Sequence, residues 1–273
     1  MDALVGRLSS MSDAQRHEHS TPELYDRFMG PLLFEPYAKV VAERAALLQP
    51  GRILETATGT GILTRALHLA VREALIVATD LNPVMLELAA QRLSSATVSF
   101  QRADAQDLPF DDESVDLVVC QFGIMFFPDK VRANEEARRV LRPGGHYLIV
   151  SFDRLEANPV PKAAGDAVAA LFPEDPPAYM ERGPFSYADP SRIEHDLAAA
   201  SFMDMTLETV ALTSRVSAPE AAKGLVLGSP FRAEIERRDS SALPRALDAV
   251  RAALARWDGI DAPMSAHVVT ATK

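Results

Sequence analysis

Residues 53–61 read Ile-Leu-Glu-Thr-Ala-Thr-Gly-Thr-Gly, an apolar run that ends on an acid and turns through a glycine-rich loop. A helical pattern follows over 62–71, and a second apolar run over 74–79 ends on Asp80, nineteen positions after Gly61. Open α/β sheets bind ligands at the carboxyl ends of parallel strands, where both acids would lie. The glycines let the backbone approach a ligand closely, and an acid about twenty residues later can bind ribose hydroxyls. The segment therefore predicts a nucleoside site.

The spacing of the glycines separates two kinds of nucleotide-binding loop. The dinucleotide fingerprint requires a third glycine, but Thr64 stands at that position, which disfavours a nicotinamide-dependent oxidoreductase. What remains is an acid followed at alternate positions by a small residue, Ala57, and by Gly59 and Gly61. This loop alone would also suit the entry to a helix in any α/β protein. Residues further along the chain distinguish a nucleoside-binding loop from an ordinary entry to a helix.

Three later segments continue the pattern of strands that end on polar residues. Asp104 follows a third expected strand over 96–102. Residues 114–122 form a nearly continuous apolar run, typical of a buried parallel strand, and Gln121 stands near its end. Residues 139–150 indicate the end of a helix, a Pro-Gly-Gly turn and a fifth strand. The alternation of strands and helices predicts an α/β fold with a mostly parallel sheet.

In this order, the features of residues 36–152 resemble class I S-adenosylmethionine (SAM) methyltransferases, in particular the methyltransferase type 11 group near the ubiquinone/menaquinone C-methyltransferase-like proteins. The family's loop usually has glycine where this chain has Ala57, a difference of one methyl group. The resemblance implies a Rossmann-like α/β fold with a seven-stranded, mostly parallel sheet of order 3-2-1-4-5-7-6. Strand 7 would be antiparallel, with helices on both faces and a helical cap. SAM would be the cofactor and S-adenosylhomocysteine the product.

The resemblance also assigns cofactor roles to residues at the strand ends. Gly59 and Gly61 would bring backbone amides to the amino-acid part of SAM, and Glu55 would order the loop or meet the SAM ammonium group through water. Asp80 would bind the ribose, and Asp104 with the residue after it would read the adenine edge. The full expected cofactor-binding set is Glu55, Ala57, Gly59, Gly61, Asp80, Leu81, Met85, Asp104, Ala105, Gln121 and Tyr25.

The chain is expected to be a single methyltransferase domain over 1–273. Its parts would be an N-terminal lid segment (1–35), the SAM-binding core (36–152), cap and insertion helices with strand 6 (153–262) and strand 7 (263–273). About fifty residues of helical pattern, between Arg215 and Pro263, replace the short link that the family has between its last two strands. Two roles are open for this insertion, and they do not exclude each other: it shapes the acceptor site, and it covers an exposed sheet edge.

Local signals place several helices. Two are expected over 22–29 and 34–48. Asn82 and Asp189, each followed by proline, are expected helix caps. Ser217, with a glutamate three positions later, predicts a capping box at the start of an insertion helix.

Composition and charge narrow the possible partners. With 273 residues and 48% hydrophobic residues, the chain can bury an α/β core as one large domain. A net charge of −10 argues against a nucleic-acid partner, because neutralising phosphates requires a basic face. The single Cys120 excludes a disulfide framework or a cysteine metal site, and no metal site is expected. The sequence has no run of eighteen apolar residues and no signal peptide, so we expect a cytoplasmic protein without a membrane span, either monomer or homodimer.

The expected activity is transfer of the SAM methyl group to oxygen, carbon or nitrogen of a small, fairly apolar molecule that enters between the lid and the cap. No histidine–carboxylate pair indicates a general base, so the catalytic residues stay unassigned and positioning is expected to dominate catalysis. The rival hypothesis is a SAM-binding protein that does not methylate, either a regulatory binder or a pericyclase-like catalyst. The expected apolar pocket lining is Phe28, Met29, Phe34, Phe122, Met125, Phe126, Leu171, Phe172, Tyr179, Tyr187, Leu225 and Phe231.

Overall fold

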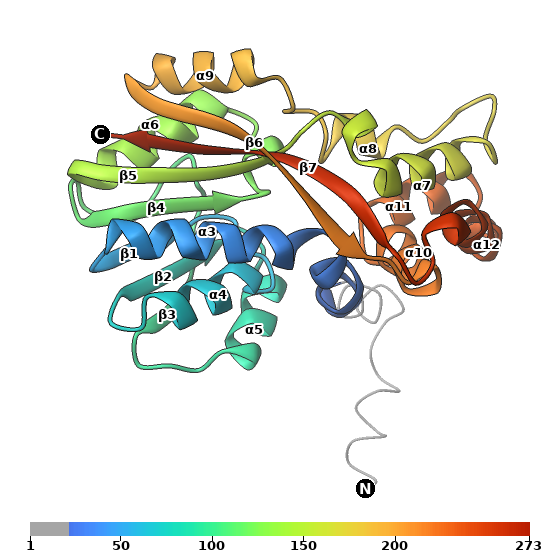
Figure 1. Ribbon diagram of the computed structural model, residues 1–273, viewed down its shortest axis with the longest axis horizontal. Helices are drawn as coiled ribbons and strands as arrows, with labels where there is room; N and C mark the ends of the chain where they lie inside the picture. The colour runs from blue at the N-terminus through green and yellow to red at the C-terminus, as the bar shows by residue number, and fades with distance from the viewer. Residues whose placement is uncertain (1–21) are drawn as a thin grey trace, which may run out of the picture.

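The computed structural model describes residues 22–273, which contain one seven-stranded sheet (Figure 1). The strands are β1 (Arg52–Glu55), β2 (Leu75–Asp80), β3 (Val98–Arg102), β4 (Val115–Gln121), β5 (Leu141–Phe152), β6 (Asp204–Arg215) and β7 (Asp261–Thr272). Their order across the sheet is β3-β2-β1-β4-β5-β7-β6. The first five strands pair in parallel, whereas β7 runs antiparallel to both β5 and β6. The expected strand order and the antiparallel seventh strand are confirmed.

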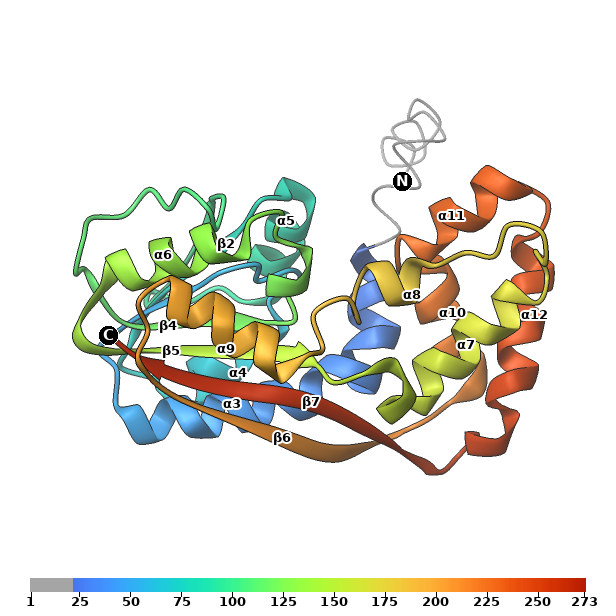
Figure 2. The same ribbon diagram turned by 90° about the horizontal axis from the view of Figure 1, so that it is seen from above.

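Helices cover both faces of the sheet, and three of them lie in the crossovers that connect parallel strands. These helices are α3 (Glu35–Leu48), α4 (Ile62–Ala70), α5 (Pro83–Arg92), α6 (Lys130–Val140) and α9 (Pro190–Ala199). Helices α3 and α4 pack together on one face, and α6 and α9 pack together on the other (Figure 2). Strand β4 is buried along most of its length, as its apolar run predicts.

Two of the three expected helix caps form. Asn82 caps α5 by accepting a hydrogen bond from the N–H of Val84. Asp189 caps α9 by accepting one from the N–H of Ser191. The capping box at Ser217 is wrong, although helix α10 (Ala218–Leu227) does begin there. The first N–H of α10 donates instead to the carboxylate of Asp258, at 2.8 Å. A carboxylate forty residues away in the chain therefore replaces the local cap.

Two boundaries of expected helices and strands also differ from those in the structure. The Pro-Gly-Gly segment lies inside β5 and not before it, where the pairing with β4 jumps from Leu141 to His146. Gly144 has a φ of 77° there, so the expected turn survives as a bulge in the strand. At the N-terminal end, the two expected helices are continuous, because the π-helix η1 (Tyr25–Phe34) runs directly into α3. Pro31 lies inside η1 and has no N–H to donate, which interrupts regular α-helical hydrogen bonding.

The remaining helices form a lobe beyond the carboxyl ends of β4 and β5 (Figure 1). They are α7 (Pro159–Ala169), α8 (Tyr179–Arg182), α10, α11 (Phe231–Arg238) and α12 (Leu243–Leu254). Helix α12 packs on α7 and α10, and α10 also packs on η1. Strand β6 stays at the edge of the sheet, with most of its side chains partly or fully exposed. The insertion therefore contributes α10, α11 and α12 to this lobe and leaves the sheet edge at β6 largely exposed.

No helix within residues 22–273 has both the length and the apolar character needed to cross a membrane.

Candidate functional site

The glycine-rich loop is held at the carboxyl edge of the sheet by its two neighbouring strands. The N–H of Thr56 donates to β4 and the N–H of Thr58 donates to β2, both at 2.9 Å. Gly59 and Gly61 have φ angles of 57° and 78°, which residues with a Cβ rarely adopt. A Cβ placed on Gly59 would meet no atom of residues 22–273 within 4 Å. The backbone of Gly59 therefore faces open space, where a ligand can approach it closely.

Asp80 ends β2, and its carboxylate joins the loop to the start of α5. One oxygen accepts from the N–H of Gly59 and the other from the N–H of Asn82, each at 2.8 Å. Burial raises the pKa of Asp80, although backbone hydrogen bonds oppose the rise. Each carboxylate oxygen has two acceptor positions. Both oxygens can thus accept a further hydrogen bond from a ligand.

Glu55 is buried beneath the loop and belongs to a short chain of hydroxyl groups. Thr64 Oγ1 donates to Glu55 Oε2 at 2.6 Å, and Thr58 Oγ1 lies 2.7 Å from Thr64 Oγ1. The Glu55 side chain thus ties the end of β1 to the start of α4 and orders the loop, the first of its two expected roles. Burial raises the pKa of Glu55 from 4.5 to about 7, and the threonine hydrogen bonds only partly offset it.

The raised pKa of Glu55 predicts a defined dependence of stability on pH. The folded chain holds this proton more tightly than the unfolded chain, so the favourable contribution is complete below pH 4.5 and is lost as pH rises through about 7. The total corresponds to roughly 3 kcal/mol. Glu55→Gln removes the ionisation, so this variant should gain stability relative to the natural chain between pH 4.5 and 8. Urea unfolding of both proteins across this range tests it, and a stability difference that is constant with pH contradicts it.

The expected adenine-binding residues lie further along the same edge. Leu81 follows Asp80 and is 56% exposed although it is apolar, and Met85 in α5 is partly exposed. Asp104 accepts from both the backbone and the side-chain nitrogen of Gln106, at 2.9 and 3.2 Å, which fixes its carboxylate. Ala105, the next residue, is partly buried. Among residues 22–273, no cluster of His, Cys, Asp and Glu could hold a metal ion.

Gln121, at the end of β4, has half of its amide unpaired. Its Nε2 donates to the carbonyl of Phe34 at 3.3 Å. Its Oε1 is buried and accepts no hydrogen bond from any residue that the structure describes. An unpaired buried acceptor costs free energy unless a donor reaches it. The oxygen is thus a ready partner for a ligand N–H at the mouth of β4.

Asp26, in η1, fastens the N-terminal segment to the glycine-rich loop. Its carboxylate accepts from Thr60 Oγ1 at 2.7 Å and pairs with Arg65 of α4 at 3.3 Å and Arg92 of α5 at 3.2 Å. Asp26 is 6% exposed, so water competes weakly for these contacts. The sequence reasoning missed this residue, because its partners lie 34 to 66 positions away and follow no spacing pattern. The structure thereby places the neighbouring Tyr25 over the strand ends.

Gly224 in α10 and Gly228, directly after its last residue, let η1 pack against the lobe. A Cβ on Gly224 would lie 2.9 Å from the Cβ of Phe28, and a Cβ on Gly228 would lie 2.9 Å from the backbone nitrogen of Tyr25. Both distances are too short for a real side chain, so only glycine permits this approach. Segment η1 is therefore held between the loop on one side and the insertion helix on the other.

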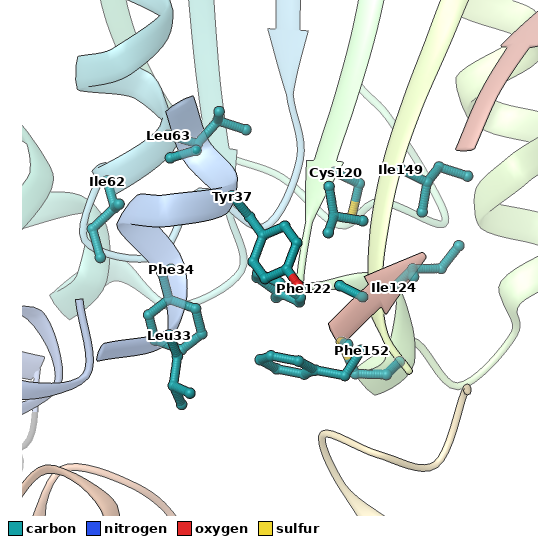
Figure 3. Close-up of a cluster of buried hydrophobic side chains, with 14 of the residues drawn as sticks. Leu33, Phe34, Tyr37, Ile62, Leu63, Cys120, Phe122, Ile124, Ile149 and Phe152 are labelled. Carbon is teal, nitrogen blue, oxygen red and sulfur yellow. The ribbon is translucent and has the colours of Figure 1, made fainter. Parts of the chain in front are cut away.

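An aromatic cavity lies between η1, the strand ends and the lobe. The rings of Phe122 and Phe152 stack with centroids 4.0 Å apart, and Phe34 lies against Phe122 at 5.7 Å (Figure 3). The cavity has a volume of about 50 Å³, and six of the twelve expected lining residues border it. Its walls are Tyr25, Met29, Leu33, Phe34, Phe122, Phe126, Phe152, Pro161, Tyr179, Met180, Pro184, Phe185, Leu225 and Ser229.

Comparison with known proteins finds relatives that are similar to the central part of the chain. Residues 54–149 match the family model described as a methyltransferase domain. Over 132 residues the chain is 34% identical to the demethylmenaquinone methyltransferase of Deinococcus radiodurans, covering 48% of this chain and 55% of that protein. Over 163 residues it is 32% identical to a ubiquinone/menaquinone biosynthesis C-methyltransferase of Pseudomonas aeruginosa, covering 57% of this chain and 64% of that protein. The chain thus spans a little more than half of these relatives.

Solved structures share the fold of this chain. The YcgJ protein of a Bacillus species superposes with a TM-score of 0.57 at 20% identity, covering 87% of this chain and 98% of that one. Phosphoethanolamine N-methyltransferase 2 of Haemonchus contortus superposes with a TM-score of 0.61 at 19% identity, covering 93% of this chain and 58% of that one. Identities this low support the fold alone, which agrees with the Rossmann-like sheet.

The glycine-rich loop differs at Ala57 from the methyltransferase pattern that it resembles, and a glycine elsewhere accommodates the change. Ala57 has a φ of 52°, a left-handed conformation that costs a residue with a Cβ about 1–2 kcal/mol. A Cβ on Gly123, just after β4, would lie 2.4 Å from the Cβ of Ala57. The methyl group of Ala57 therefore occupies the space that a side chain on Gly123 would need.

This pairing predicts a compensating double substitution. Gly123→Ala should destabilise the chain by about 1–3 kcal/mol, because two methyl groups would overlap. Ala57→Gly alone should be nearly neutral, since relief of strain offsets the greater flexibility of glycine in the unfolded chain. In the Ala57→Gly background, Gly123→Ala should cost clearly less. Denaturant unfolding of the four proteins measures the coupling, and additive effects would contradict the pairing.

Proposed function

We propose that the chain is a SAM-dependent methyltransferase that moves the methyl group of SAM to a small, fairly apolar acceptor. The observation that carries this proposal is the set of ligand-ready groups at one sheet edge: the open backbone of Gly59, the Asp80 carboxylate and the unpaired Oε1 of Gln121. The relatives named as methyltransferases support the same activity. The acceptor, the oligomeric state and placement in the cytoplasm stay predictions.

The residues present fit SAM. The Oε1 of Gln121 would accept from its ammonium group, and the backbone at Gly59 and Gly61 would lie close to its amino-acid part. Asp80 would accept from the ribose hydroxyls, and the adenine would cover exposed Leu81. Asp104 and Ala105 would bind the adenine edge, Met85 would pack on its face, and Glu55 and Ala57 would hold the loop in shape.

Tyr25 would sit over the reacting centre, held there by the contacts of Asp26. When bound, SAM supplies a methyl group on a positively charged sulfur, and the acceptor takes the methyl carbon while the broken bond's electron pair stays on sulfur. An aromatic ring near a cation stabilises it electrostatically. The aromatic walls exclude water, which favours a reaction that disperses charge.

Catalysis should depend on positioning, because none of the residues that border the cavity is a histidine, lysine or acid. Holding two reactants at near-attack distance can supply roughly 7–11 kcal/mol of the barrier. Single replacement of His146, His195 or His267 should therefore leave measurable methyl transfer to an acceptor that is nucleophilic near neutral pH. His17 and His19, for which we expect the same, lie outside the described residues. Rates of S-adenosylhomocysteine formation test this, and one histidine whose loss abolishes turnover in a folded, SAM-binding variant contradicts it.

The activity is tested by incubating the full chain with methyl-labelled SAM and a panel of phenols, carbon acids and amines. Mass spectrometry then detects S-adenosylhomocysteine and the labelled product. We expect formation of both with at least one uncharged acceptor. SAM binding without S-adenosylhomocysteine across the whole panel would favour the non-methylating alternative.

A further inference from the structure

Gln106 lies two residues after Asp104, the acid that would bind the adenine edge, and its side chain contacts two different parts of the fold. Its amide nitrogen Nε2 donates to Asp104 Oδ1 at 3.2 Å. Its amide oxygen Oε1 accepts from the backbone N–H of Asp129 at 2.8 Å. An ionised carboxylate only accepts and an N–H only donates, so these partners fix the orientation of the amide. The Gln106 side chain therefore links Asp104 to the start of α6.

The backbone of Gln106 is held by the same two neighbours. Its N–H donates to Asp104 Oδ1 at 2.9 Å, and its carbonyl accepts from Nε of Arg132, in α6, at 3.2 Å. Two positions further on, the N–H of Leu108 donates to Oε2 of Glu136, a buried residue of α6, at 2.8 Å. Arg132 also pairs with Glu136, at 3.0 Å. Gln106 and its neighbours are therefore fastened to α6 through both backbone and side chains.

These contacts set the direction of the Asp104 carboxylate. Both hydrogen bonds from Gln106 go to the same oxygen, Oδ1. The backbone of Asp104 is held as well, because its carbonyl accepts from the N–H of Asp107 at 3.0 Å. The second carboxylate oxygen, Oδ2, thus has a defined direction before a ligand binds. A donor on the ligand would then meet an acceptor that is already in position, and less side-chain freedom is lost on binding.

We propose that Gln106 is a positioning residue that makes the cofactor site specific for adenine. It acts through Asp104, whose Oδ2 would accept from the exocyclic amino group of the base. The role of Gln106 rests on the proposed function and adds base specificity to it. A carboxylate that can rotate would point away from the amino group part of the time. Loss of the Gln106 side chain should therefore weaken binding of an adenine ligand and leave a base without that amino group nearly unaffected.

The test compares S-adenosylhomocysteine with its purine analogue, in which hydrogen replaces the exocyclic amino group. Isothermal titration calorimetry on the full chain measures both affinities. We expect the natural chain to bind S-adenosylhomocysteine about 10- to 100-fold more tightly, the contribution of one hydrogen bond to a charged group.

Gln106→Leu keeps a side chain of similar size and removes both amide hydrogen bonds. It should weaken binding of S-adenosylhomocysteine about 3- to 10-fold, the loss of a neutral hydrogen bond, and leave the purine analogue within twofold. The loss is partial because the backbone N–H of Gln106 still holds Asp104. Gln49→Leu is the matched control, since Gln49 is exposed and follows α3 at the opposite edge of the sheet. It should change neither affinity.

A double substitution shows whether Gln106 acts through Asp104. In the Asp104→Ala background there is no carboxylate to position, so Gln106→Leu should change the affinity for S-adenosylhomocysteine less than twofold. Gln106→Glu is a second variant, which can still accept from the N–H of Asp129 but cannot donate to the Asp104 carboxylate when both acids are ionised. It should weaken binding of S-adenosylhomocysteine at least as much as Gln106→Leu does. Circular dichroism verifies folding, and Gln106→Glu takes the place of Gln106→Leu if the latter does not fold.

Three results would overturn the role of Gln106 while leaving the cofactor assignment in place. They are equal affinities of the natural chain for the two ligands, an equal loss for both ligands in Gln106→Leu, and the same loss with and without the Asp104 carboxylate. In each of them S-adenosylhomocysteine still binds. If the natural chain binds neither S-adenosylhomocysteine nor SAM, the cofactor assignment itself fails, and the role of Gln106 fails with it.

Discussion

Asp80→Ala is expected to weaken SAM binding about 100-fold or more. The Asp80 carboxylate would accept two ribose hydroxyls, and each charge-assisted hydrogen bond contributes about 1.5–3 kcal/mol. The loss should be larger than that from ribose contacts alone, since the same carboxylate also holds the N–H groups of Gly59 and Asn82. Isothermal titration calorimetry measures the change directly. Unchanged affinity in a folded variant would remove Asp80 from the site.

Glu73→Ala is the matched control for Asp80. Glu73 is an exposed acid just before the amino end of the same strand, β2. Its removal changes the net charge by the same amount at the opposite edge of the sheet. SAM affinity and melting temperature should stay close to those of the natural chain. A comparable loss of affinity in Glu73→Ala would mean that net charge, and not a local contact, accounts for the Asp80 result.

Asp26→Ala is expected to lower turnover more than tenfold, because Tyr25 would lose its attachment to the loop. The variant should also lose about 1–3 kcal/mol of stability, since the buried hydroxyl of Thr60 would lack its acceptor. The arginine contacts add less, because Arg65 and Arg92 are partly exposed. Initial rates of S-adenosylhomocysteine formation and urea unfolding measure the two effects. Full activity in Asp26→Ala would contradict the role of this residue in holding the lid.

Two further variants separate the contributions of charge and hydrogen bonding at Asp26. Asp26→Asn keeps an oxygen that can accept from Thr60 but removes the charge that pairs with both arginines. It should recover most of the stability and part of the turnover. Glu23→Ala removes an exposed acid from the same segment and should change neither.

The sheet could be predicted from sequence because each strand has its own local signal. An apolar run such as residues 114–122 is long and continuous enough to indicate a buried strand, and β4 occupies most of it. The loop signal was equally local, with Gly59 and Gly61 both in left-handed conformations. The carboxyl ends of parallel strands lie at the same edge of the sheet. The placement of Asp80 and Glu55 at this edge therefore follows from the fold class.

Several contacts around the candidate site could not be predicted, because they join residues distant in sequence. Asp26 reaches Arg92 across 66 positions, and Gly123 is required by Ala57 only once β1 and β4 are adjacent. Asp258 replaces the expected cap at Ser217 for the same reason. Six of the twelve residues expected to line the acceptor pocket do not border this cavity. Residues such as Phe231 and Tyr187 have apolar character suited to a pocket but lie outside the cavity walls.

The central claim is that the loop at residues 57–61 and Asp80 bind SAM. Calorimetric titration of the full chain with SAM, and separately with NADH, tests it most directly. We expect SAM to bind at one site per chain, with Asp80→Ala abolishing most of the heat, and NADH to produce none. Binding of NADH without binding of SAM would contradict the account and restore the nicotinamide-dependent alternative.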